Sequence, residues 1–300
     1  MNHQDPIFSA GGWREGNALI TWGDGLRRWA WPRLTTTLLR SGRIEAACPF
    51  AGGYALQVQG RLMWWRRGAE TLIEEASAAV DLLETRLFGR HGLLVVHRGM
   101  QLRFYQAPRA TEPVRPHGWP YRELYSFYTS SEQGGLLIQD VNRDGRPDIL
   151  CGNYWLQAPP EFAESWRLFA INLFHETPLA ASARLAWFRG RLLWLESKSA
   201  RARASWFTPP PDPRQLWIET PLEIDLRYPR GVTASAGRIW IAEAAPESPR
   251  LWSWPDGTWR PLPEAAAALV ACDGVILAVG PAGRPWPVAG GGRYRERPRK

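Results

Sequence analysis

Residues 190–210, GRLLWLESKSARARASWFTPP, contain two kinds of short element that return along the chain. The first is a Gly followed by an apolar run, GRLLWL, which is typical of a buried strand entered through a tight turn. The second is an aromatic segment that ends at Pro, ASWFTPP. Its large rings are typical of a strand packed between sheets, and the Pro ends the strand. This stretch predicts a pair of β-strands.

The Gly-led strand recurs seven times. The copies are GNALITW, GRLMWW, GLLVVH, GLLIQD, GRLLWL, GRIWIA and GVILAV, beginning at Gly16, Gly60, Gly92, Gly135, Gly190, Gly237 and Gly274. Six intervals separate the first Gly from the last, with a mean of 43 residues. This period matches the blade of a β-propeller and not the repeat of a helical solenoid. The seven glycines are therefore expected at equivalent positions in successive blades.

The aromatic element follows most of these strands and gives the 18 Trp residues a structural role. Its copies are LRRWAWP, QLRFYQAP, NYWLQAP, ASWFTPP, RLWSWP and GRPWP. Rings at alternate positions, as in Trp29 with Trp31 and Trp252 with Trp254, place large flat side chains on one face of the strand. We interpret most Trp residues as packing between blades and not as a ligand cage. The second unit, WWRRGAETLIEE, lacks the pattern.

The predicted fold is an all-β propeller with seven four-stranded antiparallel blades, and six or eight blades are the alternatives. One domain is expected over residues 1–290, with a basic tail at 291–300. Closure of the ring requires the N-terminal strands to share a blade with the GRPWP region or to abut it. Residues 70–88 compete as a helix, because apolar side chains recur there at helical spacing without Gly or Pro. Residues 160–174 are ambiguous in the same way.

Composition limits the class of protein. The chain has 45% hydrophobic residues, which excludes a disordered protein. Its three Cys residues match no metal spacing and fit a reducing compartment. The N-terminus shows no secretory signal, and the longest apolar run is broken by Asp273 and Gly274. We expect a cytoplasmic chain that is peripheral to the membrane if it meets one.

The net charge of +8 points to an anionic partner. The arginines are spread along the chain, and no nucleic-acid-binding motif is present, so nucleic acid is not favoured. An acidic protein and the anionic lipid surface of the cytoplasmic leaflet remain equally open as partners.

Residues 139–159, QDVNRDGRPDILCGNYWLQAP, resemble a metal-binding loop. The EF-hand pattern fails, because its twelfth position would be Cys151 instead of Glu. The shorter pattern D-x-N-x-D-G-x-x-D is present, and its oxygen donors suit Ca²⁺. The predicted ligands are Asp140, Asn142, Asp144, the Arg146 carbonyl and Asp148. We favour one structural Ca²⁺, or a hydrogen-bonded turn without metal, over a functional metal.

This loop and the segments around it resemble the FG-GAP or VCBS repeat family of β-propellers. The resemblance is specific over residues 119–175 and only architectural elsewhere. It implies a propeller with a calcium ion held in the loop, used for adhesion, carbohydrate binding or assembly more often than for catalysis. The chain departs from the family pattern because only one of its seven units has the acidic loop and no export signal is visible.

Catalytic patterns are absent from the sequence. The five His residues form no H-E-x-x-H motif, and no G-x-S-x-G, P-loop or G-x-G-x-x-G pattern follows a strand. We therefore expect a non-enzymatic interaction or scaffold subunit that docks onto a larger assembly, for example at the cytoplasmic face of a membrane complex. A carbohydrate-binding propeller is the alternative, because exposed Trp rings stack on sugars. A polysaccharide lyase or hydrolase is the third hypothesis.

Overall fold

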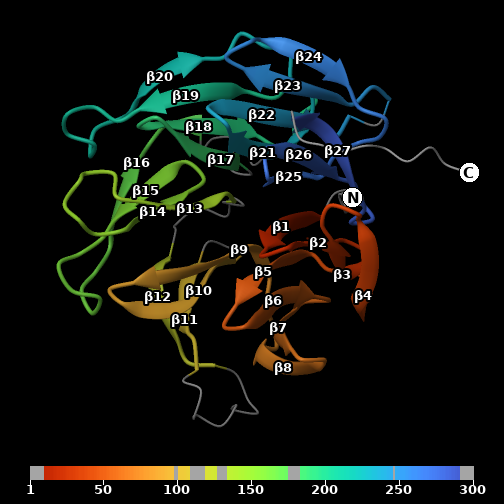
Figure 1. Cartoon of the computed structure of the whole chain (residues 1–300). Coiled ribbons are helices and arrows are strands. Elements are labelled where there is room, and N and C mark those ends of the chain that lie inside the picture. Colours follow the sequence, from red (N-terminus) through yellow and green to blue (C-terminus); the bar gives the residue numbers. More distant parts are fainter. Residues whose placement is uncertain are drawn as a thin grey trace, which may run out of the picture. The chain divides into compact units, whose positions relative to one another are not determined.

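The computed structural model describes residues 10–97, 101–108, 119–126, 134–174, 183–245 and 247–290. Within these ranges the chain folds into seven antiparallel sheets that follow one another along the sequence, with no α-helix (Figure 1). Six sheets have four strands, and the last has three in the described residues. In each sheet the strands lie in their order along the chain. The predicted fold class is confirmed: the chain is a seven-bladed β-propeller.

Two compact units make up the chain, and we describe each by itself. Unit 2, Ile44–Pro229, holds four sheets. Their strands are β5 (Ala46–Phe50), β6 (Gly53–Val58), β7 (Arg61–Arg66) and β8 (Ala69–Glu74); β9 (Ala79–Leu87), β10 (Arg90–His97), β11 (Gln101–Gln106) and β12 (Tyr121–Ser126); β13 (Leu136–Gln139), β14 (Asp148–Cys151), β15 (Tyr154–Gln157) and β16 (Arg167–Ala170); and β17 (Ala183–Phe188), β18 (Arg191–Glu196), β19 (Ala204–Thr208) and β20 (Ile218–Pro221).

Unit 1 combines the residues up to Arg43 with those from Arg230 onward. Its strands are β1 (Gly11–Glu15), β2 (Ala18–Trp22), β3 (Gly25–Ala30) and β4 (Thr35–Ser41); β21 (Pro229–Ser235), β22 (Arg238–Glu243), β23 (Arg250–Trp254) and β24 (Thr258–Pro261); and β25 (Ala268–Cys272), β26 (Val275–Val279) and β27 (Pro285–Gly290). The single domain over residues 1–290 stays a prediction, and the tail at 291–300 lies outside the described residues.

The two segments with helical spacing are extended. Residues 70–88 form most of β8 and the whole of β9, so the helical alternative is wrong there. The buried Ala79 and Leu82 of β9 pack toward the β5–β8 sheet, and the buried Leu87 packs toward the β13–β16 sheet. Residues 160–174 contain β16 and no helix. In both segments the apolar side chains satisfy packing between sheets, which overrides their helical spacing.

The Gly-led strands occupy equivalent positions only in part. Gly190, Gly237 and Gly274 lie in the turn between the first and second strands of their sheets, as does Gly16. Gly60 instead lies between the second and third strands of its sheet, so the prediction for that residue is wrong. Two further copies also depart: Gly92 lies inside β10, and Gly135 precedes β13.

Two-residue turns with positive φ at both positions explain Gly190, Gly237 and Gly274. Arg189–Gly190, Ala236–Gly237 and Asp273–Gly274 each have φ between 46° and 78°. This is the type I′ turn, whose twist matches that of a β-hairpin and which strongly favours Gly at its second position. The β9–β10 hairpin uses the same turn at Phe88–Gly89.

The aromatic elements are the third strands of their sheets. They contain β3, β11, β15, β19, β23 and β27. The β5–β8 sheet has the element too: its third strand is β7, RLMWWR, which the sequence pattern had assigned to the Gly-led class. Trp64 of β7 is buried, and Trp65 stacks on Tyr54 with ring centroids 5.6 Å apart.

The hydrophobic cores lie between consecutive sheets of each unit. In unit 2, Trp64 and Trp119 pack with Phe50 between the β5–β8 and β9–β12 sheets. Trp155 and Trp194 pack between the β13–β16 and β17–β20 sheets. None of the 18 Trp residues, all of which are described, is an exposed residue. The interpretation of Trp as packing between blades is confirmed.

The two ends of the described chain meet inside unit 1. The Thr21 hydroxyl of β2 donates a hydrogen bond to the Gly283 carbonyl at 2.5 Å, and Arg14 of β1 forms an ion pair with Asp273. Leu19 and Trp29 share a core with Val270 and Leu277. The first sheet therefore abuts the sheet that contains β27, as propeller closure requires.

Candidate functional site

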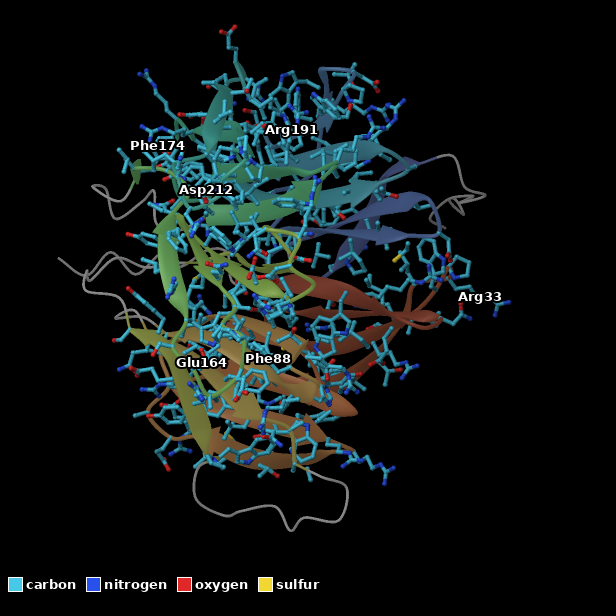
Figure 2. The ribbon with its side chains drawn as sticks, turned by 90° about the vertical axis from the view of Figure 1, so that its left-hand side faces the viewer. Arg33, Phe88, Glu164, Phe174, Arg191 and Asp212 are labelled. Atoms are coloured by element: carbon cyan, nitrogen blue, oxygen red, sulfur yellow. The ribbon has the colours of Figure 1, made fainter. Side chains whose placement is uncertain are left out.

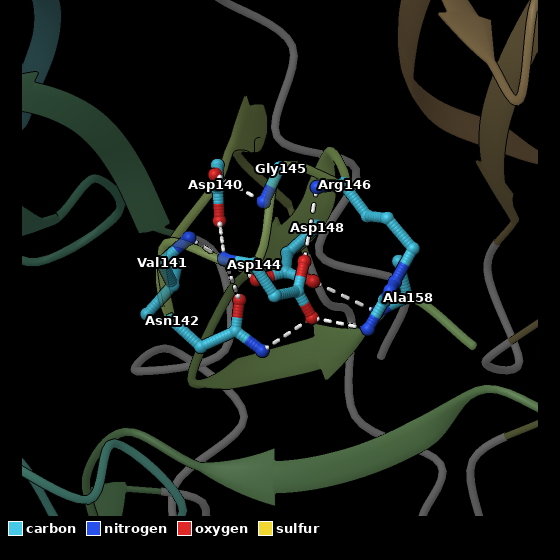
Figure 3. A network of polar contacts seen from close by, with 8 residues as sticks. All are labelled: Asp140, Val141, Asn142, Asp144, Gly145, Arg146, Asp148 and Ala158. Carbon is cyan, nitrogen blue, oxygen red and sulfur yellow. Dashed lines mark hydrogen bonds and ion pairs between the residues drawn. The ribbon is translucent and has the colours of Figure 1, made fainter. Parts of the chain in front are cut away.

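The acidic loop between β13 and β14 is held by its own hydrogen bonds (Figure 3). The Asp140 carboxylate accepts from the backbone N–H groups of Asp144, at 3.1 Å, and Gly145, at 3.0 Å. The Asn142 side-chain oxygen accepts a second bond from the Asp144 N–H at 3.2 Å. Gly145 has φ of 83°, which Gly adopts without strain. These bonds form an Asx-type turn.

Both carboxylate oxygens of Asp144 accept hydrogen bonds. Oδ1 accepts from the Arg146 backbone N–H at 2.9 Å. Oδ2 accepts from the Asn142 amide at 2.8 Å and forms an ion pair with the Arg146 guanidinium at 2.5 Å. The guanidinium thus supplies the positive charge that a metal ion would otherwise bring to this carboxylate.

Asp148 is fully buried at the start of β14. Its Oδ2 accepts from the Val141 N–H at 3.1 Å, and its Oδ1 accepts from the Ala158 N–H at 2.8 Å. Burial raises the pKa of Asp148 to about 6, although the two N–H donors oppose this shift. The carboxylate ties the loop to the segment that follows β15.

The predicted ligands fit a metal ion only in part. Asp140, Asn142 and Asp144 come together, whereas the Asp148 oxygens serve two other backbone groups. In the described residues no group of three or more His, Cys, Asp or Glu side chains has the closeness that metal binding needs. The five-ligand calcium site therefore stays a prediction. The arrangement itself is that of a hydrogen-bonded strut.

A second candidate site is a set of arginines at one end of unit 2. The first strands of its sheets run in the same sense. Ala51 donates its N–H to Glu84 of β9, Asp81 of β9 accepts from the N–H of Leu136 in β13, and Gly135 lies directly against Ala183 of β17. Because each sheet has the same strand order, the turns between first and second strands and between third and fourth strands lie at one common end. We call this the turn end.

Six arginines lie in or beside the hairpin turns of this end, at least one from each of the four sheets. They are Arg66, Arg67, Arg90, Arg143, Arg189 and Arg191. We call them the arginine turn face. Within the described ranges none of the six forms an ion pair with a carboxylate. Arg191, which is half-buried, is labelled in Figure 2.

Aromatic rings support most of these guanidinium groups. Arg66 lies over Trp64 at 5.4 Å, Arg90 over Phe162 at 5.0 Å and Arg191 over Trp206 at 4.7 Å. Arg189 lies over Phe188 at 5.1 Å. A guanidinium on a ring face is fixed in place, while its N–H edges remain free to bind a carboxylate or phosphate.

Four aspartates at the turn end have partners outside this face. Asp140, Asp144 and Asp148 are engaged inside their loop, and Asp212 forms an ion pair with Arg214 at 2.8 Å. Asp212 and Glu164, which are labelled in Figure 2, belong to the connections between third and fourth strands. The four aspartates therefore do not pair with the arginine turn face.

A partly buried polar network lies between the β5–β8 and β9–β12 sheets. Glu74 forms an ion pair with Arg103 at 2.5 Å and accepts a hydrogen bond from the Tyr105 hydroxyl. His97 lies 3.5 Å from both the Glu74 carboxylate and the Tyr105 hydroxyl. Burial lowers the pKa of His97 to about 4, with a smaller contribution from Arg103, while Glu74 opposes the shift. The neutral His97, the Tyr105 hydroxyl and the Glu74–Arg103 ion pair thus connect the two sheets.

Sequence comparison with known proteins assigns no family to the chain. No family model and no curated protein matches the sequence, so membership of the FG-GAP or VCBS family stays a prediction. Part of its range, residues 127–133 and 175, lies outside the described residues. None of the described segments forms a helix of the length and apolar character that a bilayer span requires.

Solved propellers are similar in structure. The WD40 β-propeller domain of Doa1 matches with a TM-score of 0.60 and 10% identity, over 93% of this chain and 91% of that chain. The β-propeller domain of Cps50 (Swd1) from Myceliophteria thermophila matches with a TM-score of 0.59 and 12% identity, over 93% and 94%. Sqt1 of Saccharomyces cerevisiae matches with a TM-score of 0.54 and 11% identity, over 93% and 84%. These similarities show the fold alone.

Proposed function

We propose that this chain is a non-enzymatic β-propeller subunit that binds an acidic protein partner through the arginine turn face. The observation that carries the proposal is the set of six arginines on four consecutive sheets, none of which is paired with a carboxylate in the described part of the chain. Arginines that stand unpaired on a rigid sheet scaffold are suited to recognising carboxylates on another molecule.

An acidic protein surface suits this face better than a lipid head-group layer does. Four of the six guanidinium groups rest on aromatic rings, so their positions are set by the fold. Fixed positions favour a partner whose carboxylates are also fixed, because little conformational entropy is then lost on binding. A fluid lipid layer needs positive charge but no such spacing. Docking at the cytoplasmic face of a membrane complex would follow if the acidic partner belongs to one.

The carbohydrate-binding alternative has less support. Stacking on a sugar needs an accessible ring face, and none of the Trp residues is exposed. The third hypothesis, a polysaccharide lyase or hydrolase, would need carboxylates and arginines clustered at a channel mouth. The polar network of Glu74, His97 and Arg103 instead lies between two sheets, where His97 is buried and Arg103 is paired with Glu74.

Charge reversal tests the proposal. The variant Arg67→Glu with Arg189→Glu alters two exposed turn positions on different sheets. The control Arg43→Glu with Arg260→Glu makes the same charge change on exposed residues of unit 1. Each form is used to capture proteins from its native lysate, and the captured partner is then purified and titrated at several salt concentrations. We expect an acidic partner whose affinity falls at least about tenfold in the turn variant and is unchanged in the control.

Two outcomes would contradict the proposal. One is a partner that binds the turn variant as tightly as the parent. The other is binding to vesicles of phosphatidylcholine with phosphatidylserine that is lost in the turn variant, because the face would then serve a lipid surface.

A further inference from the structure

The outer strand of the first sheet, β4, has an edge with which no strand of the described residues pairs (Figure 1). β4 is last in the strand order of its sheet and pairs with β3 alone. Its sequence is TTTLLRS, and Leu38 is 54% exposed. An uncovered strand edge presents a row of backbone N–H and C=O groups to which another strand can bind. β4 is therefore a candidate interaction surface of unit 1.

The outer strands of the other sheets are protected against such pairing. Each has charged residues, prolines or both, which are the features with which natural proteins protect sheet edges. They are Glu70 and Glu74 in β8, Arg122 and Glu123 in β12, Arg167 in β16, Glu219 and Pro221 in β20, Arg260 and Pro261 in β24, and Pro285 and Pro287 in β27. β4 instead begins with five residues that include neither a charge nor a proline, and three of these are Thr, which favours strands.

The neighbouring strand holds β4 in place. β4 pairs with β3 over residues 35–41, with a bulge at Leu39. Trp29 of β3 lies opposite Thr36, packs on the core of the first and last sheets, and donates its indole N–H to Thr21. The strand is thus formed before any partner arrives, so little conformational entropy is lost when another strand pairs with it.

The arginines beside β4 have partners within unit 1. Their contacts are Arg27 with the Ala282 carbonyl at 3.2 Å, Arg28 with Glu15 at 3.7 Å and Arg40 with the Ser41 carbonyl at 2.8 Å. The segment Thr35–Leu38 has no charge of its own. A charged strand would gain no complementary charge along it, so the strand that fits is itself uncharged. β4 has this character over the same residues.

We propose that β4 pairs with β4 of a second copy of this chain, antiparallel, and that the two copies form a two-fold symmetric dimer. When Thr37 lies on the axis, it faces its own counterpart, and Leu38 faces Thr36 of the other copy. Thr–Thr pairs of this kind stabilise neighbouring strands. The interface uses the same strand of both copies, so it closes on itself and does not extend into a fibre.

The antiparallel arrangement also keeps like charges apart. Arg40 comes opposite the uncharged residues 34–35, and Arg33 comes opposite the uncharged residues 41–42. Parallel pairing in register would instead place Arg40 beside Arg40, which is destabilising. The arginines of β3 in the two copies are separated by both β4 strands, a distance of about 14 Å, which exceeds the screening length at physiological salt.

The mass of the full chain in solution tests the proposal. Sedimentation velocity is measured over protein concentrations from about 1 to 200 µM. We expect a reversible dimer with a Kd in the micromolar range, because one strand pair buries less area than a permanent interface does. A monomer at every concentration, or a mass that grows beyond the dimer, would overturn the proposal.

Variants at Leu38 connect the dimer to β4. Leu38 is exposed, so Leu38→Lys is expected to keep the fold and to weaken the dimer at least about tenfold. The matched control is Ile218→Lys on β20, which changes another exposed residue in the same way and should leave the dimer intact. An equimolar mixture of Leu38→Lys and Leu38→Glu should dimerise more strongly than either variant alone. Equal dimerisation by the parent and Leu38→Lys would contradict the assignment to β4.

Cross-linking tests the position of the axis. The three native Cys residues are buried. Two facing Cα atoms in an antiparallel pair lie about 4.5–5.5 Å apart, which a disulfide can span. Thr37→Cys is therefore expected to give a disulfide-linked dimer under mild oxidation, and Ile218→Cys is not. A dimer that Thr37→Cys does not cross-link would have a different interface. None of these results depends on the acidic protein partner.

Discussion

Asp148 shows how one buried carboxylate fixes a loop. Its two oxygens accept N–H groups from Val141 and Ala158, so it joins the start of the acidic turn to the segment after β15. The cost of burying the charge appears as the raised pKa of this carboxyl. Asp140 and Asp144 need no such burial, because their carboxylate oxygens accept hydrogen bonds from turn N–H groups and, at Asp144, pair with the Arg146 guanidinium.

Asp144→Ala should lower the melting temperature by a few degrees, with or without a calcium chelator. The variant leaves the Arg146 N–H and the Asn142 amide without their acceptor, which costs about 1 kcal/mol. Scanning calorimetry of both forms, with added Ca²⁺ and with chelator, checks this. A melting temperature that falls with chelator in the parent but not in the variant would instead establish the predicted calcium site.

His97 predicts a defined dependence of stability on pH. Its pKa in the fold is about 4, below the 6.5 of the free side chain, because burial and, to a smaller extent, Arg103 disfavour the charged form, although Glu74 opposes the shift. A lowered pKa means that the unfolded chain binds the proton more readily. The stability contributed by the neutral His is therefore complete above about pH 6.5 and is lost as the pH falls toward 4.

His97→Gln should remove this part of the pH dependence. The parent is expected to lose up to about 3 kcal/mol of unfolding free energy through this group between pH 7 and pH 4. Urea denaturation of both forms at pH 7 and pH 4.5 measures the difference, since the carboxylates common to both cancel. Parallel pH profiles in the two forms would show that His97 does not titrate in this window.

At the scale of single elements, the hairpin turns govern how the strands are paired. The β5–β8 sheet uses the same type I′ geometry in three successive turns, Ala51–Gly52, Gln59–Gly60 and Arg67–Gly68. A Gly before an apolar strand therefore marks any hairpin, and not only the first one of a sheet. This is why the sequence pattern placed Gly60 one strand too early.

Ala236→Asn should stabilise the protein by about 0.5 kcal/mol. Ala236 has φ of 50° in the Ala236–Gly237 turn, a conformation that Asn adopts more readily than Ala. Gly190→Ala is the opposite test: a methyl group there would meet no atom within 4 Å, so only its φ of 78° opposes it. We expect a loss of about 1 kcal/mol. Equal melting temperatures for all three forms would contradict the turn argument.

The sequence predicted the third strands better than the turns. Paired aromatic residues such as Trp252 and Trp254 serve one purpose, packing between sheets, so they mark one kind of strand. The sequence pattern identified the acidic loop but did not predict its hydrogen bonds. Residue spacing predicts neither the ion pair between the Arg146 side chain and Asp144 nor the hydrogen bond from the Ala158 N–H to Asp148. The arginine turn face did leave a signal, because Arg stands next to a turn Gly at positions 67, 90, 189 and 191.

At the scale of the whole molecule, one buried hydroxyl connects residues that are 262 positions apart. Thr21 donates to the Gly283 carbonyl and accepts from the Trp29 indole N–H at 2.8 Å. The surrounding core contains Leu19 from the first sheet and Leu277 from the last. Unit 1 thus depends on contacts between the two ends of the described chain.

Thr21→Val should lower the unfolding free energy by about 1–3 kcal/mol. The replacement keeps the shape but leaves a buried carbonyl and an indole N–H without partners. Thr37→Val, on the exposed edge strand β4, is the control and should change stability by less than about 0.5 kcal/mol. Chemical denaturation followed by Trp fluorescence measures both. A similar small effect in the two variants would mean that this bond does not hold the first and last sheets together.

Unit 1 combines two segments that are far apart in sequence, so its sheets are made at different times during translation. The strands β1–β4 leave the ribosome well before β25–β27, the sheet they pack against. The four sheets of unit 2 are contiguous in sequence, so all of them have emerged before β25–β27 is made. Throughout that interval Leu19 and Trp29 have no core to join, and a nascent chain with uncovered apolar strands is a substrate for chaperones.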